Sequence, residues 1–341
     1  MRPLILKGHT RPLTCVKYNR DGDLLFSCSK DNVPTVWYSE NGERLGTYDG
    51  HKGTVWWLDV TKDSQYLVTG GADMSVKVWR VKSGEMLHDF PHTGPVRHVE
   101  WSEGDKMFLT VADPFRGAPS TVSIFDFSGS NVEGQSQEPK YVWENTGLPV
   151  GRKITHATWT PLNKNIITTD DDGTIRVHEV DTGRVIREMK EHTKRINAIS
   201  WNKEKFLFIT GSADFTAKLW DLEEWKVLKT YETDRPVNSV AISPIKEHVF
   251  VAGGQEAMAV TTTSGKLGKF ETKLFHTVFG EEFGNVRGHF GPVNTIAIHP
   301  DGTGFVSGSE DGYCRVHHFD KEYFQLHSEL DDLEALSALT R

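Results

Sequence analysis

The chain has 341 residues, 37% of them hydrophobic and 25% charged, and a formal net charge of −8. This negative balance argues against general binding to nucleic-acid phosphates, which clustered Lys and Arg side chains drive. No apolar run approaches the ~20 residues that cross a bilayer, and the N-terminal MRPLILKGH has too short an apolar stretch for a signal peptide. We therefore expect no contact with membranes. Three cysteines without paired spacing favour a reducing, cytoplasmic compartment over a disulfide scaffold.

Residues 2–7 (RPLILK) are predicted to form an isolated first strand, and a recurring unit begins after them. Each unit opens at an apolar residue that starts an alternating run. These opening residues are Leu13, Val55, Val96, Ile154, Ile196, Val237 and Val293. The shorter units span 41 or 42 residues, and the third and sixth are longer. A period of ~40–45 residues is that of a four-stranded propeller blade.

The second unit illustrates the four predicted strands, which are 54–59 (TVWWLD), 66–70 (YLVTG), 75–79 (SVKVW) and 85–90 (EMLHDF). Short alternating runs rich in β-branched and aromatic residues are typical of strands. The fifth unit nearly repeats the second, since ITGSADFTAKLW (209–220) echoes VTGGADMSVKVW (68–79). Predicted loop insertions at 113–120, 128–139 and 253–270 lengthen the third and sixth units.

These units predict an all-β fold, a seven-bladed WD40 β-propeller over residues 1–325. The last unit has a poorly marked outer strand. We expect the strand at 2–7 to pair with that last blade and close the ring, which leaves no open edge. In residues 326–341, Leu side chains recur every three or four positions, which predicts a short amphipathic helix.

A set of polar residues recurs in the units and imitates a catalytic triad. A hydrolase that uses His9, Ser27 and Asp31 is one interpretation. An enzyme needs only one such set, so its repetition favours side chains that satisfy buried polar groups between strands. We therefore predict no catalysis, no cofactor and no metal site. The predicted structural residues are His9, Ser27, Asp31 and Trp37; His51, Thr69, Asp73 and Trp79; His192, Thr210, Asp214 and Trp220; and His289, Ser307 and Asp311.

Two units depart from this pattern at the tryptophan position. The fourth unit has His178 there and the seventh has His317. The sixth unit lacks most of the set. We expect these blades to be locally weaker or to be held by their neighbours.

Three segments carry a more specific resemblance. They are HTRPLTCVKYNRDGDLLFSCSKD (9–31), VTTTSGKLGKFETKLFH (260–276) and VRGHFGPVNTIAIHPDGTGFVSGSEDG (286–312). With them, the chain resembles the subunit I family of eukaryotic translation initiation factor 3, a family of WD-repeat proteins. The sixth-unit insertion makes this resemblance specific, because a generic repeat lacks it.

The resemblance implies a non-catalytic scaffold inside a multisubunit complex that recruits messenger RNA to the small ribosomal subunit. It also implies docking on the C-terminal segment of the B subunit and on the G subunit. The small ribosomal subunit would be reached only through the complex, without direct binding to RNA. A signalling adaptor or peptide-binding propeller of the same fold is the alternative.

The fifth unit offers a candidate docking site. Its first–second turn (202–205) and third–fourth turn (221–226) are expected on one face, because successive antiparallel strands reverse direction. One interpretation is a solvated acidic rim, with the tryptophan tucked against the adjacent blade. With the resemblance, we expect the site to bind a basic amphipathic helix of the B subunit, with the tryptophan as an exposed anchor. The predicted partner-binding residues are Glu204, Asp221, Glu223, Glu224 and Trp225.

Overall fold

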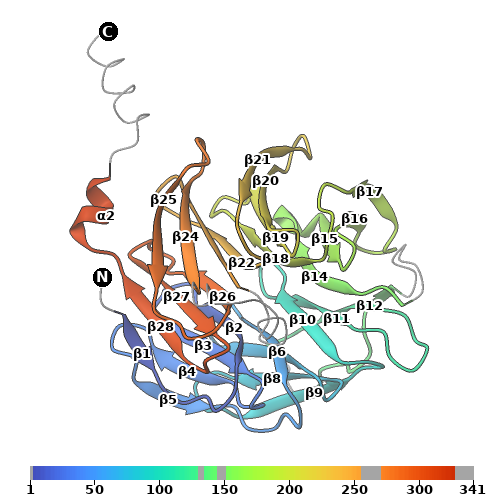
Figure 1. Cartoon of the computed structure of the whole chain (residues 1–341). Helices are drawn as coiled ribbons and strands as arrows, with labels where there is room; N and C mark the ends of the chain where they lie inside the picture. The colour runs from blue at the N-terminus through green and yellow to red at the C-terminus, as the bar shows by residue number, and fades with distance from the viewer. Residues whose placement is uncertain (1–2, 130–133, 144–150, 255–269, 327–341) are drawn as a thin grey trace, which may run out of the picture.

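The computed structural model describes residues 3–129, 134–143, 151–254 and 270–326. In these residues the chain forms seven four-stranded antiparallel sheets arranged in a ring (Figure 1). The predicted seven-bladed β-propeller is therefore confirmed. No helix in the described part of the chain is long and apolar enough to pass through a bilayer.

The strands follow one another from the inner to the outer edge of each blade. They are β2 Leu13–Tyr18, β3 Leu24–Ser29, β4 Thr35–Tyr38 and β5 Arg44–Thr47 in the first blade; β6 Val55–Val60, β7 Tyr66–Gly71, β8 Ser75–Arg80 and β9 Met86–Pro91 in the second; β10 Val96–Trp101, β11 Met107–Ala112, β12 Thr121–Asp126 and β13 Tyr141–Trp143 in the third; β14 Ile154–Trp159, β15 Asn165–Asp170, β16 Ile175–Glu179 and β17 Val185–Met189 in the fourth; β18 Ile196–Trp201, β19 Leu207–Ser212, β20 Thr216–Asp221 and β21 Val227–Glu232 in the fifth; β22 Val237–Ile242, β23 His248–Gly253, β24 Glu271–His276 and β25 Glu282–Arg287 in the sixth; and β26 Val293–Ile298, β27 Gly304–Ser309, β28 Cys314–His318 and β1 Leu4–Leu6 in the seventh.

Each predicted opening residue is the first residue of an inner strand. The insertions of the third blade lie between β11 and β12 and between β12 and β13. The insertion of the sixth blade begins where β23 ends at Gly253, and β24 begins at Glu271. Residues 130–133 and 255–269 of these insertions lie outside the described residues.

Every inner strand contains a β-bulge at its second residue. The pairing with the neighbouring strand skips from the first to the third position in all seven inner strands. A bulge re-aims the extra side chain. Four of these side chains donate a hydrogen bond to the carbonyl of the first residue of the next inner strand: Thr14 to Val55 at 2.6 Å, Asn197 to Val237 at 2.9 Å, Asn238 to Val293 at 3.1 Å and Asn294 to Leu13 at 3.0 Å.

The third residue of the inner strand makes a second contact between blades. The Thr295 hydroxyl accepts from the Val16 N–H at 3.1 Å, and Ser239 accepts in the same way from Ile296 at 3.0 Å. In the second, third and fourth blades this position is Trp57, His98 and His156, and their ring centroids lie 4.7 to 5.1 Å apart. Packed rings thus replace the hydroxyl contacts on that side of the axis.

Glycine in the second strand allows adjacent blades to approach closely. A Cβ atom on Gly70 would lie 2.8 Å from a methyl group of Val96, and one on Gly211 would lie 2.6 Å from a methyl group of Val237. A side chain at either position would collide with the next inner strand. This packing accounts for the glycine that the second and fifth units share.

The N-terminal strand closes the ring, as predicted. Strand β1 pairs antiparallel with β28, with Leu4 opposite Val316 and Leu6 opposite Cys314. Leu6 is buried in a cluster that also contains Trp37 of the first blade. The two ends of the propeller therefore share one sheet (Figure 1).

A short helix follows the last blade. The helix α2 (Lys321–Gln325) begins at Asp320, whose carboxylate accepts from the Tyr323 N–H at 3.1 Å. The Tyr323 hydroxyl bonds His248 of β23 at 2.8 Å. This turn precedes the tail helix predicted for residues 326–341, and its buried Tyr323 packs with Phe319 against the sixth and seventh blades. The tail helix predicted beyond Leu326 lies outside the described residues.

Deleting residues 1–7 should destabilise the ring. The deletion exposes the edge of β28 and removes the buried Leu6 side chain, which together should cost about 3 kcal/mol or more. Thermal unfolding and light scattering should show a lower Tm and association of the truncated chain. Adding a synthetic peptide of residues 2–8 should restore part of the stability. A monomeric truncated chain with an unchanged Tm would contradict the closure.

Candidate functional site

Four blades contain a chain of hydrogen bonds that links a loop to two strands. In the second blade, the Trp79 indole N–H donates to the Thr69 hydroxyl at 2.8 Å, and that hydroxyl lies 2.7 Å from His51 Nε2. His51 Nδ1 lies 3.0 Å from the Asp73 carboxylate. When a neutral imidazole carries its proton on Nδ1, the indole N–H, the Thr69 O–H and the imidazole N–H of this network each have one acceptor.

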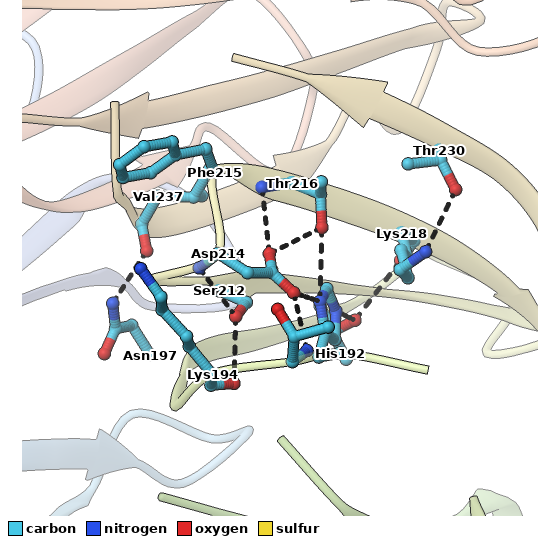
Figure 2. Close-up of polar contacts among 12 residues, drawn as sticks. His192, Lys194, Asn197, Ser212, Asp214, Phe215, Thr216, Lys218, Thr230 and Val237 are labelled. Atoms are coloured by element: carbon cyan, nitrogen blue, oxygen red, sulfur yellow. Dashed lines mark hydrogen bonds and ion pairs between the residues drawn. The ribbon is translucent and has the colours of Figure 1, made fainter. Parts of the chain in front are cut away.

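The fifth blade repeats this geometry. His192 lies 2.8 Å from the Thr210 hydroxyl and 2.9 Å from Asp214. The Trp220 indole donates to Thr210 at 2.9 Å. Figure 2 shows Asp214 between His192 and Thr216, whose hydroxyl donates to the same carboxylate at 2.7 Å. The aspartate thereby holds the turn between β19 and β20.

The first blade contains the same four residue types. His9 lies 2.7 Å from the Ser27 hydroxyl and 2.9 Å from Asp31, and the Trp37 indole donates to Ser27 at 2.8 Å. Burial opposes ionisation of Asp31, but hydrogen bonds from His9 and Ser29 outweigh this effect and lower its pKa to about 2. The carboxylate is therefore ionised at neutral pH.

The seventh blade lacks the tryptophan. His289 still contacts Ser307 at 2.8 Å and Asp311 at 3.0 Å. His317 replaces the indole, and its Nδ1 has no hydrogen-bond partner. The buried Arg315 instead donates to Asp311 at 2.8 Å.

The fourth blade uses other contacts in place of the missing set. His178 takes the tryptophan position and lies 2.8 Å from the Thr168 hydroxyl. The buried Arg176 pairs with Asp170 and, at 2.8 Å, with Glu188. The ion pair lies within the blade, and the third blade adds a contact, because the Trp143 ring stacks on His178 with centroids 5.1 Å apart.

The repeated networks do not offer a nucleophile to a substrate. The hydroxyl-bearing residues Ser27, Thr69 and Thr210 are each 0% exposed. Each hydroxyl already accepts from an indole N–H and contacts an imidazole, whereas a catalytic hydroxyl must reach the reacting carbon. The described part of the chain also contains no group of three or more side chains arranged to hold a metal ion.

The predicted acidic turns of the fifth blade lie side by side. The Leu222 N–H donates to the Phe206 carbonyl at 3.1 Å, which joins the turn after β18 to the turn after β20. Glu204, Glu223 and Glu224 are exposed, and Asp221 is half-buried. Asp221 accepts from the Glu224 N–H at 2.7 Å.

Salt bridges modify the charge of this surface. Lys226 pairs with Glu224, and Lys205 lies 3.5 Å from Glu103 of the third blade. Glu204 accepts from the Asn202 amide at 3.2 Å, which leaves its charge unbalanced. Among the described residues, Glu204, Asp221 and Glu223 have no salt-bridge partner, so this surface keeps a negative charge.

Trp225 is not the exposed anchor that we expected. The residue is half-buried, with φ of 57°, and its ring packs 6.3 Å from the Phe208 ring. The guanidinium of Arg187, from the fourth blade, lies 5.8 Å from the Trp225 ring centroid. The indole therefore packs between the fifth-blade turn and the fourth blade.

Sequence reasoning missed the apolar side chains that this face does expose. Phe206 is 69% exposed and Leu162, in the short helix η1 (Pro161–Asn163), is 88% exposed. Glu103 links their turns, because its carboxylate accepts from the Leu162 N–H at 2.7 Å and pairs with Lys205. The sequence does contain a sign of this exposed side chain. Phe206 occupies a turn position where four other blades have the polar residues Asp23, Gln65, Lys106 or Thr303.

The contribution of the networks to stability stays a prediction, which substitution tests. Asp73→Ala should leave His51 and the Lys52 N–H without their shared acceptor and cost about 1–3 kcal/mol. Asp214→Ala should behave alike in the fifth blade. Asp49→Ala is the matched control, because within the described residues that exposed carboxylate accepts only from Thr47. Denaturant unfolding of the three variants measures the difference, and equal stability of all three would refute the structural role.

The family model and the similar proteins found by comparison all point to one family. The family model described as EIF3I matches residues 1–329. Proteins named eukaryotic translation initiation factor 3 subunit I are similar to the chain: that of Drosophila melanogaster is 46% identical over 95% of this chain and 99% of its own length. That of Schizosaccharomyces pombe is 44% identical over 95% and 98%, and that of Taeniopygia guttata is 45% identical over 96% and 100%. The chain therefore belongs to the subunit I family of eukaryotic translation initiation factor 3.

Proposed function

We propose that the chain is a non-catalytic scaffold subunit of eukaryotic translation initiation factor 3, which supports recruitment of messenger RNA to the small ribosomal subunit through protein contacts. The family match over residues 1–329 carries this proposal. It supports a role in translation initiation, which takes place in the cytoplasm. It also favours this role over that of a signalling adaptor, because it spans the sixth-blade insertion that a generic blade lacks.

The structure supports a scaffold rather than an enzyme. The hydroxyl groups that resemble nucleophiles are buried and hydrogen-bonded within the blades. The turns and loops of a rigid ring are left as the surface that other molecules meet. The chain itself contacts no RNA in this proposal, and the small ribosomal subunit is reached through the complex.

The acidic turns of the fifth blade are the proposed docking site for the C-terminal segment of the B subunit. Glu204, Asp221 and Glu223 supply negative charge that suits a basic amphipathic helix. Phe206 supplies the exposed apolar contact, and Trp225 keeps the turn in place. The G subunit is proposed as a second partner on another part of the ring.

Charge reversal tests this docking site. The pair Glu204→Lys and Asp221→Lys should weaken binding of the isolated B-subunit segment by about tenfold or more, with little change in Tm. Because Asp221 also accepts from the Glu224 N–H, the pair Glu204→Lys and Glu223→Lys alters exposed charges alone. Calorimetric titration of both pairs measures the loss.

The control for charge reversal is the pair Glu43→Lys and Glu85→Lys, on exposed turns of the first and second blades. This pair should bind the segment as the unaltered chain does. Equal binding by all folded variants would exclude the fifth-blade turns. Purification of the tagged chain should in addition recover the other subunits of the factor, whereas recovery of a signalling assembly alone would favour the adaptor.

A further inference from the structure

A second surface on the same face of the ring combines negative charge with a hollow that has an apolar wall. It runs across the turns of the seventh, first and second blades and consists of two hollows, of about 620 and 470 Å³. Tyr38, which is 43% exposed, lines both hollows. We call this surface the Tyr38 groove.

One hollow of the Tyr38 groove is acidic. Its walls include Asp21, Asp23, Glu40 and Asp301. Asp301 already pairs with His299. Asp23 accepts from the Asn19 amide at 2.7 Å, a neutral donor that leaves its charge unbalanced. None of the salt bridges among the described residues provides a Lys or Arg partner for Asp21, Asp23 or Glu40, so three carboxylates face solvent without a counter-charge.

The other hollow combines an apolar wall with polar side chains, among them Thr47, Ser64 and Lys82. Leu24, Val36 and Val81 line it, and Leu45 on its rim is 43% exposed. The Tyr48 hydroxyl, which could make the floor polar, donates to the Val81 carbonyl at 3.1 Å. Gly46 leaves one wall open, since no atom lies within 4 Å of the position its Cβ would take. A volume of this size suits one or two large side chains rather than a folded domain.

We propose that the Tyr38 groove binds a segment of a partner protein in which Arg or Lys side chains stand beside large apolar side chains. The unbalanced carboxylates attract the cations, and the hollow with the apolar wall takes a Leu or Phe side chain. Tyr38 lies between the two hollows and separates the contacts with the cations from the contacts with the apolar side chains. This site is distinct from the fifth-blade turns and does not depend on the docking proposed there.

The probe for this proposal is the synthetic peptide acetyl-SRRGSLFSG-amide, added to the full chain with isotope-labelled methyl groups. NMR should show shifts of the Leu24, Leu45 and Val81 methyl groups on binding. Replacing both arginines of the peptide by glutamate should weaken binding about tenfold or more, and replacing its Leu-Phe pair by Ser-Ser should do the same.

Variants of the chain locate the contact. Asp21→Lys with Glu40→Lys, and separately Leu45→Glu, should each weaken peptide binding about tenfold, since all three side chains are exposed and their loss leaves the core intact. Glu204→Lys with Glu223→Lys makes the same change of charge on the fifth blade and should bind the peptide normally.

Several results would overturn the proposal. They are absence of peptide binding at millimolar concentration, equal binding of the glutamate peptide, and equal binding by the groove variants. Leu45 shifts that grow with protein concentration without peptide would assign the groove to a second copy of the chain instead. Normal peptide binding by a chain that fails to bind the B-subunit segment would leave this proposal standing while refuting the other.

Discussion

Each blade of this ring buries polar side chains, and the fold depends on giving them partners inside the protein. A buried donor or acceptor without a partner costs about 1–3 kcal/mol, and the arrangement repeats around the ring. On the inner side, bulged residues such as Asn238 and Asn294 bond the next blade. Further out, a hydroxyl, an imidazole and a carboxylate bond one another within a blade. Because these contacts are directional, we expect them to fix the spacing of strands that hydrophobic packing alone would leave adjustable.

This arrangement also explains why a triad-like set belongs to a protein whose relatives are named initiation factor subunits. Histidine, hydroxyl and aspartate suit catalysis because they exchange hydrogen bonds readily, and the same property suits them to a buried network. The solvent exposure of the hydroxyl distinguishes a catalytic set from a buried structural network. In this ring the hydroxyl is buried and accepts a hydrogen bond from an indole N–H.

The period of apolar residues was enough to predict the seven inner strands and the closing strand, because alternation and spacing are local properties of the sequence. The histidine, hydroxyl and aspartate positions also came from repetition. The position of the Trp225 side chain could not be predicted from repetition, because Arg187, which contacts its ring, belongs to the neighbouring blade. The helix turn around Tyr323 was missed for a related reason, because it depends on a contact with His248 of another blade, which no single unit encodes. The bulges at residues such as Asn197 were missed because they change the pairing of two strands within a blade, which the alternation of residue types does not show.

The pKa of the Asp31 carboxyl group, measured by carbon-13 NMR titration, tests most directly whether the networks hold ionised aspartates. The account predicts a value of about 2, below the ordinary 3.8, because the carboxylate accepts hydrogen bonds from His9 and from the Thr10 N–H. A folded pKa below the unfolded one means that this interaction stabilises the ring above about pH 4 and is lost as the pH falls towards 2. A measured pKa at or above 3.8 would contradict the account, since the carboxylate would then gain nothing from its partners.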